Sequence, residues 1–313
     1  MQLVESKTAF LFPGQGSQKV GMGFDLAEAF PRARDIFDQA DKWLDIPLSR
    51  IAWQGPEETL NDTLNTQPAL LVHSIAALQI FKDRLTTFKP TLVAGHSMGE
   101  LSALVASDSL PFLDTLSLVR KRGELMKQAG EVNPGGMAAI LGLDLKTIEE
   151  ICSEVSQPEE IVQVANDNCP GQVVISGAND ALDEALQLAE RAGARRVIKL
   201  AVSIAAHSPL MALAQSDFND AVDKSPINNP NISIIGNVNA SPLTSSKDII
   251  SDLQSQLNSR VRWTETINYM IANGVDTFLE FGSGSVLTGL LKRISRKVTG
   301  ISIGDPQDFE ILS

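Results

Sequence analysis

The pattern that most restricts how this chain can fold is the stretch "VAGHSMGEL" (93–101), in which Ser97 stands between two glycines as G-x-S-x-G. The apolar run "TLVAG" (91–95) predicts a buried strand, and "MGELSALVASDS" (98–109) continues at helical spacing. A strand, a tight turn and a helix form the context in which this pattern projects a serine from the end of a sheet. Without that context, Ser97 would be only a small residue tolerated in a turn. We predict that Ser97 is a nucleophile and that the backbone N–H of Met98 helps to bind an oxyanion.

A serine hydroxyl is inert at neutral pH without a base, and the chain has only three histidines. His73 lies in the apolar helical stretch "PALLVHSIAAL", which favours a buried structural histidine. His96 adjoins Ser97, so its ring leaves the turn in another direction, which favours a structural hydrogen bond. His207 lies in the small-residue segment "SIAAHSPLM", and the order Ser then His is typical of hydrolase-like enzymes. We predict that His207 is the general base.

The spacing of apolar residues predicts an α/β fold in two parts, with a first amphipathic helix near 25–43. Strands and helices alternate over 1–132 and 202–313, which we assign to an α/β-hydrolase-like catalytic core with a parallel sheet. Residues 133–201 show the pattern of a ferredoxin-like (βαββαβ) small subdomain inserted between them. The residues alone support a Ser–His dyad, with a backbone carbonyl or an unidentified side chain orienting the imidazole. The candidate third members of a triad all fall in the subdomain: Asp144, Glu159, Glu160, Asp167 and Asp180.

The composition excludes several classes of function. A net charge of −12 argues against nonspecific nucleic-acid binding, because phosphates need a surface of Lys and Arg. The two cysteines, Cys152 and Cys169, form neither a disulfide framework nor the spacing of a zinc site. We see no signal peptide and no run near the roughly 18 apolar residues of a membrane span. We expect a cytoplasmic monomer that binds neither nucleic acid nor membrane and holds no metal.

Six motifs follow one another along the chain and carry a family resemblance. They resemble those of the malonyl-CoA:acyl carrier protein transacylases of fatty acid synthesis and their acyltransferase relatives in polyketide synthases. The resemblance covers nearly the whole chain, and it implies transfer of a malonyl group to the phosphopantetheine thiol of an acyl carrier protein. Neither a metal nor a redox cofactor is implied. The motifs are "FPGQGSQ" (12–18), "GHSMGE" (95–100), Arg122-Gly123, "NCPGQVVISG" (168–177), "AAHSPLM" (205–211) and "GSGSVLTGLLKRI" (282–294).

The resemblance also implies roles for individual residues. Ser97 would carry the acyl group, and Gln15 would add a backbone N–H to the oxyanion hole beside Met98. The main chain of Gln256 would orient the histidine, although Gln254 stands two residues away and leaves the alignment open. Room beside a small Ala206 leaves α-substituted malonyl groups open as substrates. The expected substrate contacts are Asn166, Asn168 and Ala206.

Arg122 would pair with the free carboxylate of the malonyl group. The planar guanidinium fork suits bidentate contact with a carboxylate. On spacing alone a solvated basic helix face is an equal interpretation, because Arg120 and Lys121 stand beside it. The resemblance favours Arg122 as the substrate residue, with Arg120 and Lys121 as surface charges.

An acidic carrier protein needs a local basic surface on a chain this acidic. The segment "VLTGLLKRISRKV" (286–298) combines an apolar helical stripe with a cluster of cations, although an ordinary solvated helix end is an equal interpretation. The basic cluster comprises Lys292, Arg293, Arg296 and Lys297.

Two other functions stay open: an acyl hydrolase of the same fold that clears acyl groups from carrier proteins, and a noncatalytic module that binds carrier proteins. An arginine that pairs with a carboxylate on the acyl group argues against the hydrolase. The joint presence of a nucleophile, a base and this arginine argues against the noncatalytic module.

Overall fold

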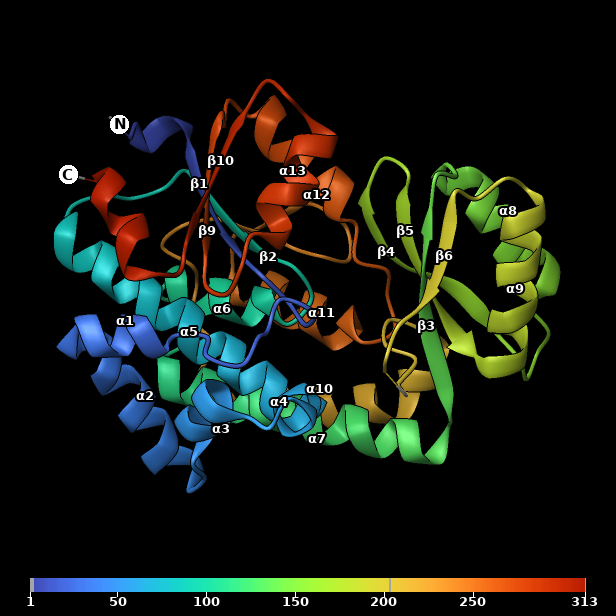
Figure 1. Cartoon of the computed structure of the whole chain (residues 1–313), viewed down its shortest axis with the longest axis horizontal. Helices are drawn as coiled ribbons and strands as arrows, with labels where there is room; N and C mark the ends of the chain where they lie inside the picture. Colours follow the sequence, from blue (N-terminus) through green and yellow to red (C-terminus); the bar gives the residue numbers. More distant parts are fainter. Residues whose placement is uncertain (1–2, 203, 313) are drawn as a thin grey trace.

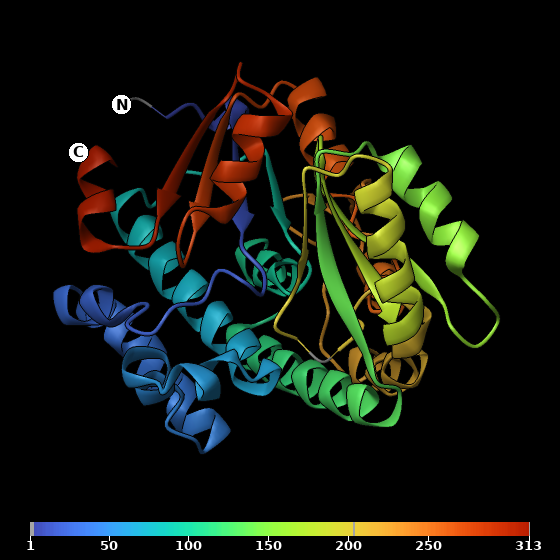
Figure 2. The same cartoon turned by 45° about the vertical axis from the view of Figure 1, so that its right-hand side comes forward.

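The chain folds around two β-sheets, which a computed structural model describes over residues 3–202 and 204–312 (Figure 1). Sheet A has six strands and sheet B has four. Figure 2 shows the same arrangement from a second side, with sheet B beside sheet A. In order across sheet A, the strands are β10 (Thr299–Ile303), β9 (Thr277–Phe281), β1 (Thr8–Phe12), β2 (Leu92–Gly95), β7 (Ile234–Ile235) and β8 (Pro242–Leu243).

Sheet A is parallel except at its edge, where β8 pairs antiparallel with β7. Its central strand β1 is buried on both faces: Phe10 and Phe12 pack into one apolar core, and Ala9 and Leu11 pack into another. A continuous apolar strand of this kind is typical of a parallel sheet covered by helices on both sides. The helices around sheet A are α1 (Phe24–Ala29), α2 (Pro31–Leu44), α3 (Leu48–Gln54), α4 (Glu57–Asn61), α5 (Thr63–Arg84), α6 (Gly99–Ala106), α7 (Phe112–Val132), α10 (Ala212–Asp223), α11 (Ser246–Gln256), α12 (Trp263–Ala272) and α13 (Val286–Ile294), with short 3-10 helices at Glu5–Lys7, Pro209–Met211 and Pro306–Leu312.

Sheet B is antiparallel throughout and has its own apolar core under two helices. Its order β4-β5-β3-β6 follows from a βαββαβ chain in which the third strand lies between the first two. The helices α8 and α9 lie on the side of sheet B turned away from sheet A (Figure 1). The elements are β3 (Gly135–Leu141), α8 (Leu145–Val155), β4 (Val162–Cys169), β5 (Gln172–Ala178), α9 (Asn179–Arg191) and β6 (Arg196–Lys199).

The α/β class, the parallel sheet and the ferredoxin-like module are thus confirmed. The helix predicted near 25–43 is two helices, because Phe30 has an extended backbone (φ −130°, ψ 113°) immediately before Pro31. The boundaries at 132/133 and 201/202 stay predictions, and residues 1–2, 203 and 313 of those ranges lie outside the described residues. No helix in the described part of the chain has the length and apolarity to cross a membrane.

Candidate active site

The turn after β2 places Ser97 at the carboxyl end of sheet A, directly before α6. Its backbone is in the left-handed region (φ 52°), which is strained for a residue with a side chain. Gly95 and Gly99 must both be glycines, because the neighbouring backbone lies too close to leave room for a side chain. A Cβ on Gly95 would lie 1.9 Å from the carbonyl of Gly99, and a Cβ on Gly99 would lie 2.1 Å from the carbonyl oxygen of Phe12. The geometry is that of a nucleophile elbow.

Asn237, which follows β7, braces this turn and was missed by the sequence reasoning. Its Oδ1 accepts a hydrogen bond from the N–H of Ser97 (2.7 Å), and its Nδ2 donates to the carbonyl of Gly95 (2.8 Å). Asn237 is buried. The sequence did contain one indication of this role: Asn237 is a polar residue just past a predicted strand, where the carboxyl ends of neighbouring parallel strands meet.

The structure brings His207 to Ser97 from a distant part of the chain. Ser97 Oγ lies 2.8 Å from His207 Nε2. His207 Nδ1 lies 2.9 Å from the carbonyl oxygen of Gln256 and 3.1 Å from that of Ser259. Because carbonyl oxygens only accept, Nδ1 carries the proton and Nε2 is left free to accept one from the serine. The orienting groups are backbone carbonyls rather than a carboxylate.

The environment of His207 keeps its imidazole neutral. Burial is the largest cause and the charge of Arg122 the next, and together they lower the pKa of His207 to about 3. A neutral imidazole beside a hydroxyl can serve as a general base at physiological pH.

This environment predicts an unusual pH dependence. The imidazole is active above its lowered pKa, so we expect kcat/KM for malonyl-CoA to stay level as the pH falls from 7 to about 5. Arg122→Ala removes one of the causes that lower the pKa of His207. The fall in kcat/KM of this variant at low pH, measured with acetyl-CoA, should therefore begin at a higher pH than in the unmodified enzyme. Rate measurements across this range provide the test. An acid limb near pH 6.5 in the unmodified enzyme would contradict the prediction.

Arg122 is buried with its guanidinium against Ser97. Only 1% of the residue is exposed. One terminal nitrogen donates to Gln67 Oε1 (2.8 Å), and the other donates to Ser97 Oγ (3.1 Å) and Gln256 Oε1 (3.0 Å). Arg122 Nε has no hydrogen-bond partner, and no carboxylate pairs with the guanidinium, among the residues described. Burial lowers the pKa of Arg122 to about 10, so it is a cation at neutral pH.

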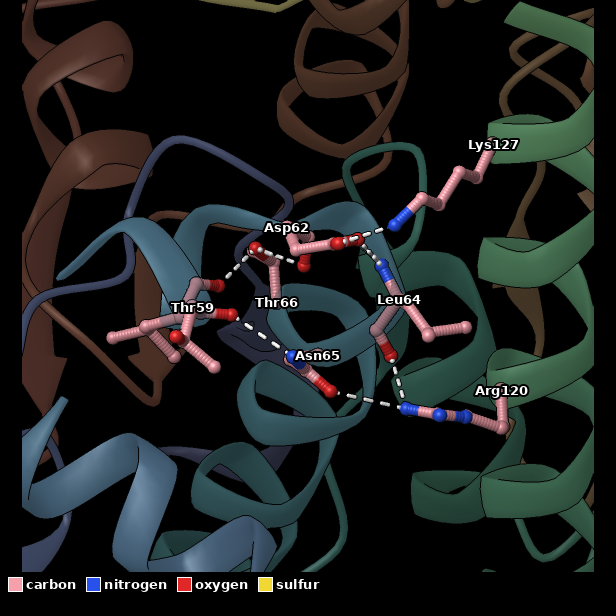
Figure 3. A network of polar contacts seen from close by, with 8 residues as sticks. Thr59, Asp62, Leu64, Asn65, Thr66, Arg120 and Lys127 are labelled. Atoms are coloured by element: carbon pink, nitrogen blue, oxygen red, sulfur yellow. Dashed lines mark hydrogen bonds and ion pairs between the residues drawn. The ribbon is translucent and has the colours of Figure 1, made fainter. Parts of the chain in front are cut away.

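Helix α7 packs against α5, and Figure 3 shows Arg120 and Lys127 of α7 reaching the first turns of α5. Pro68, inside α5, has no N–H and leaves the carbonyl of Leu64 free, and Arg120 donates to that oxygen (2.9 Å). Lys127 Nζ lies 2.6 Å from a carboxylate oxygen of Asp62, and Asp62 caps the start of α5. Two residues along a helix correspond to a rotation of about 200°, so Arg120 and Arg122 project in different directions.

The sequence interpretation of Arg120 as a surface charge is therefore wrong, because its side chain is only 20% exposed and completes the first turns of α5. Lys121 is exposed as expected, next to Glu124.

The residues expected to form the oxyanion hole lie at neighbouring strand ends. Phe12 pairs with Gly95 in the register of β1 and β2, which brings the loop carrying Gln15 beside the elbow. The side chain of Gln15 accepts from Thr63 Oγ1 (2.9 Å). Within the described residues, no protein acceptor binds the N–H of Gln15 or of Met98. Two free N–H groups at this place can stabilise a developing oxyanion.

Sheet B contributes to the site through β4. Asn168 Oδ1 lies 2.7 Å from His96 Nε2, so His96 makes a structural hydrogen bond across the two sheets. Asn166, two residues earlier, lies beside Val261 in an isolated bridge. Both asparagines are buried, as is Ala206 directly before the base.

The third histidine, His73, is also structural. It is buried in α5, and its Nε2 lies 2.9 Å from the carbonyl oxygen of Gly304.

A pocket of about 590 Å³ opens beside the proposed oxyanion loop. Its wall includes Gln15, Asp62, Lys127 and Ile204, from the loop after β1, the start of α5, α7 and the segment after β6. No cluster of three or more metal-ligating side chains was found in the part of the chain that the structure describes.

Comparison with known proteins shows the family to which this chain is similar. The acyl transferase domain family matches residues 9–304. The malonyl CoA-acyl carrier protein transacylase of Bacillus subtilis (strain 168) is 46% identical over 306 residues, 98% of this chain and 96% of that protein. The structure of an acyl carrier protein S-malonyltransferase from Vibrio cholerae O1 biovar eltor is 40% identical, with a TM-score of 0.94 over 98% of this chain and 100% of that one.

A second solved structure holds a type II PKS acyl carrier protein in its holo form in complex with its malonyl-transacylase. That protein is 40% identical, with a TM-score of 0.94 over 97% of this chain and 98% of that one. In each comparison the match covers nearly all of this chain and nearly all of the other protein, which rules out a match confined to one shared module. The chain therefore belongs to the acyl transferase family and, within it, to the malonyl-CoA:acyl carrier protein transacylases.

Proposed function

We propose that this chain transfers the malonyl group of malonyl-CoA to the phosphopantetheine thiol of an acyl carrier protein through an acyl-Ser97 intermediate. The observation that carries the proposal is the buried guanidinium of Arg122, 3.1 Å from the nucleophile and without a carboxylate partner in the described residues. Glu100 acts on the charge of Arg122 without forming an ion pair with it, and a buried cation that no carboxylate contacts is costly. The malonyl carboxylate can supply that contact, whereas a hydrolase for uncharged acyl groups has no use for the cation.

In the first half-reaction, Ser97 Oγ attacks the thioester carbonyl while His207 Nε2 takes its proton. The N–H groups of Gln15 and Met98 stabilise the oxyanion, and the carbonyl of Gln256 stabilises the imidazolium. The C–S bond then breaks, and His207 returns the proton to the sulfur of coenzyme A. The product is a malonyl ester on Ser97.

The second half-reaction runs through the same groups. The carrier thiol gives its proton to His207, and its sulfur attacks the ester carbonyl. The bond to Ser97 Oγ breaks, and the oxygen regains the proton from His207. No step requires a metal or a redox cofactor, and we propose that the protein acts as a monomer in the cytoplasm.

The acyl group would lie against Asn166, Asn168 and Ala206. Asn168 would act by holding His96, and the small side chain of Ala206 leaves space near the acyl α-carbon. A methyl group in such a space changes selectivity by only ~1–3 kcal/mol. We therefore include α-substituted malonyl groups among the substrates to be tested.

The test is intact-protein mass spectrometry after incubation with malonyl-, methylmalonyl- or acetyl-CoA. We expect a malonyl adduct that maps to Ser97, a weaker acetyl adduct, and loss of the malonyl adduct on addition of a holo carrier protein. Equal acetyl and malonyl loading, or a malonyl adduct that water removes as fast as the carrier does, would overturn the proposal.

The carrier surface that we propose is narrower than the basic cluster seen in the sequence. Arg293 donates to the carbonyl of Gly171 (3.2 Å) and to the side chain of Gln172 in the β4–β5 turn, so it ties α13 to sheet B. All four cations are exposed, but the side chains of the other three make no hydrogen bond or ion pair within the described residues. We propose that these three meet the acidic carrier: Lys292, Arg296 and Lys297.

Charge reversal tests this surface. Lys292→Glu with Arg296→Glu should raise KM for the carrier several-fold, because rim charges act mainly on encounter. The rate of malonyl loading from malonyl-CoA should be unchanged. Lys146→Glu, on the outer helix α8, is the matched control, since Lys146 is also exposed. An unchanged carrier KM in the double variant would rule this surface out.

A further inference from the structure

Glu100 is a buried acid beside the site that the proposed mechanism does not use. It is the last residue of "GHSMGE" and lies in the first turn of α6, fully buried. Its Oε2 accepts a hydrogen bond from Gln256 Nε2 (2.7 Å). Its carboxyl group faces that of Asp252 on α11. Glu100 Oε1 and Asp252 Oδ2 accept no hydrogen bond from any other described residue.

Two carboxyl groups placed together in the interior cannot both be ionised, so they share one proton. Burial and the neighbouring Asp252 raise the pKa of Glu100 well above its ordinary value. A proton on Glu100 Oε1 would allow that oxygen to donate to Asp252 Oδ2, while Oε2 remains the acceptor for Gln256. This arrangement satisfies both of the oxygens that otherwise have no partner.

Glu100 and the carbonyl oxygen of Ser97 together fix which way the amide of Gln256 points, because Gln256 Nε2 donates to both (2.7 and 3.4 Å). Because Nε2 donates to Glu100, Oε1 must face Arg122, where it accepts from the guanidinium (3.0 Å). A reversed amide would present N–H groups to a cation. The backbone carbonyl of the same Gln256 accepts from His207 Nδ1. One residue therefore connects the acid pair, the substrate cation and the base.

We propose that Glu100, held by Asp252, is a positioning residue that fixes the amide of Gln256 and thereby aims Arg122 at the malonyl carboxylate. No hydrogen bond joins the Glu100 carboxyl group to Ser97 Oγ in the described residues, so its contact with the site runs through Gln256, and its charge raises the pKa of Arg122. The inference rests on the proposed malonyl transfer. It adds that Glu100, which does not touch the substrate, helps the enzyme to select malonyl over uncharged acyl groups.

The test compares Glu100→Gln with Glu100→Ala. Glutamine keeps both contacts, since its oxygen can accept from Gln256 and its NH₂ can donate to Asp252, whereas alanine keeps neither. The readout is the ratio of malonyl to acetyl loading rates on Ser97, which does not depend on how much of the variant is folded. We expect the ratio to fall about tenfold in Glu100→Ala and to stay near the original value in Glu100→Gln.

Glu280→Ala is the matched control, because Glu280 is also a buried acid but caps α13 through the N–H groups of Leu287 (2.9 Å) and Thr288 (2.7 Å). It should lower Tm and leave the loading ratio unchanged. An unchanged ratio in Glu100→Ala, or a Glu100→Gln variant as impaired as Glu100→Ala, would overturn the inference alone. Absence of a malonyl adduct in the unmodified enzyme would instead overturn the proposed function.

Discussion

Replacing Ser97 by alanine is expected to remove the malonyl adduct completely and to lower transfer to the carrier by about 10⁶-fold, the scale found when a Ser–His enzyme loses its nucleophile. The reason is geometric. Ser97 Oγ is the hydroxyl that lies within 2.8 Å of His207 Nε2 and beside the free N–H groups of the elbow. A small alanine in the same turn leaves the fold in place but supplies no atom that can carry the acyl group.

The measurement is the intact mass of the variant after malonyl-CoA, together with the rate of malonyl-carrier formation. Gln15→Ala is the control within the same site. The proposed contribution of Gln15 is its backbone N–H, and its side chain accepts a hydrogen bond from Thr63 rather than from Ser97 or His207, so this variant should still be acylated. An adduct on Ser97→Ala would show that another residue is the nucleophile.

The strand–turn–helix around Ser97 could be predicted because each of its determinants is local. The apolar run of β2 forms the buried strand, and the two glycines permit the close approach that the turn needs. The βαββαβ module was predictable for a similar reason, since the apolar periodicity of each strand and helix is complete within a few residues. His207 could be found by elimination among three histidines.

The residues that sequence reasoning missed act through contacts between distant segments. Asn237 reaches the elbow only because β7 pairs with β2, and Gln67 reaches Arg122 only because α5 packs on α7. Arg120 was misjudged because its partner is a carbonyl that Pro68 leaves free on another helix. Such contacts depend on tertiary packing, which periodicity within one segment does not determine.

The small subdomain takes part in the site rather than merely covering it. The bond between His96 and Asn168 joins the elbow to β4, and Gln163 Nε2 donates to the carbonyl of His207 (2.7 Å). Arg293 joins α13 to the β4–β5 turn from the other part of the chain. The turn that carries Ser97 and the backbone of His207 are thus both hydrogen-bonded to β4, so the distance between Ser97 and His207 depends on the relative position of the two sheets.

Replacing Arg122 by alanine should reduce kcat/KM for malonyl-CoA by roughly 10²- to 10⁴-fold, the equivalent of the ~3–5 kcal/mol lost when one partner of a buried ion pair is removed. The loss follows because a malonyl carboxylate would enter a buried site that no longer holds a cation. Acetyl-CoA carries no carboxylate, so its loading should survive or improve. The two loading rates on Ser97, measured by mass spectrometry, give the comparison.

Arg120→Ala is the matched control for Arg122→Ala, because it removes a guanidinium from the same helix. Arg120 supports the carbonyl of Leu64 and does not contact Ser97, so its loss should lower Tm and keep the malonyl-to-acetyl ratio. If Arg122→Ala lowered loading of both acyl groups equally, the guanidinium would serve the serine rather than the substrate. The 3.1 Å contact to Ser97 Oγ makes that outcome physically reasonable, and the acetyl measurement separates the two roles.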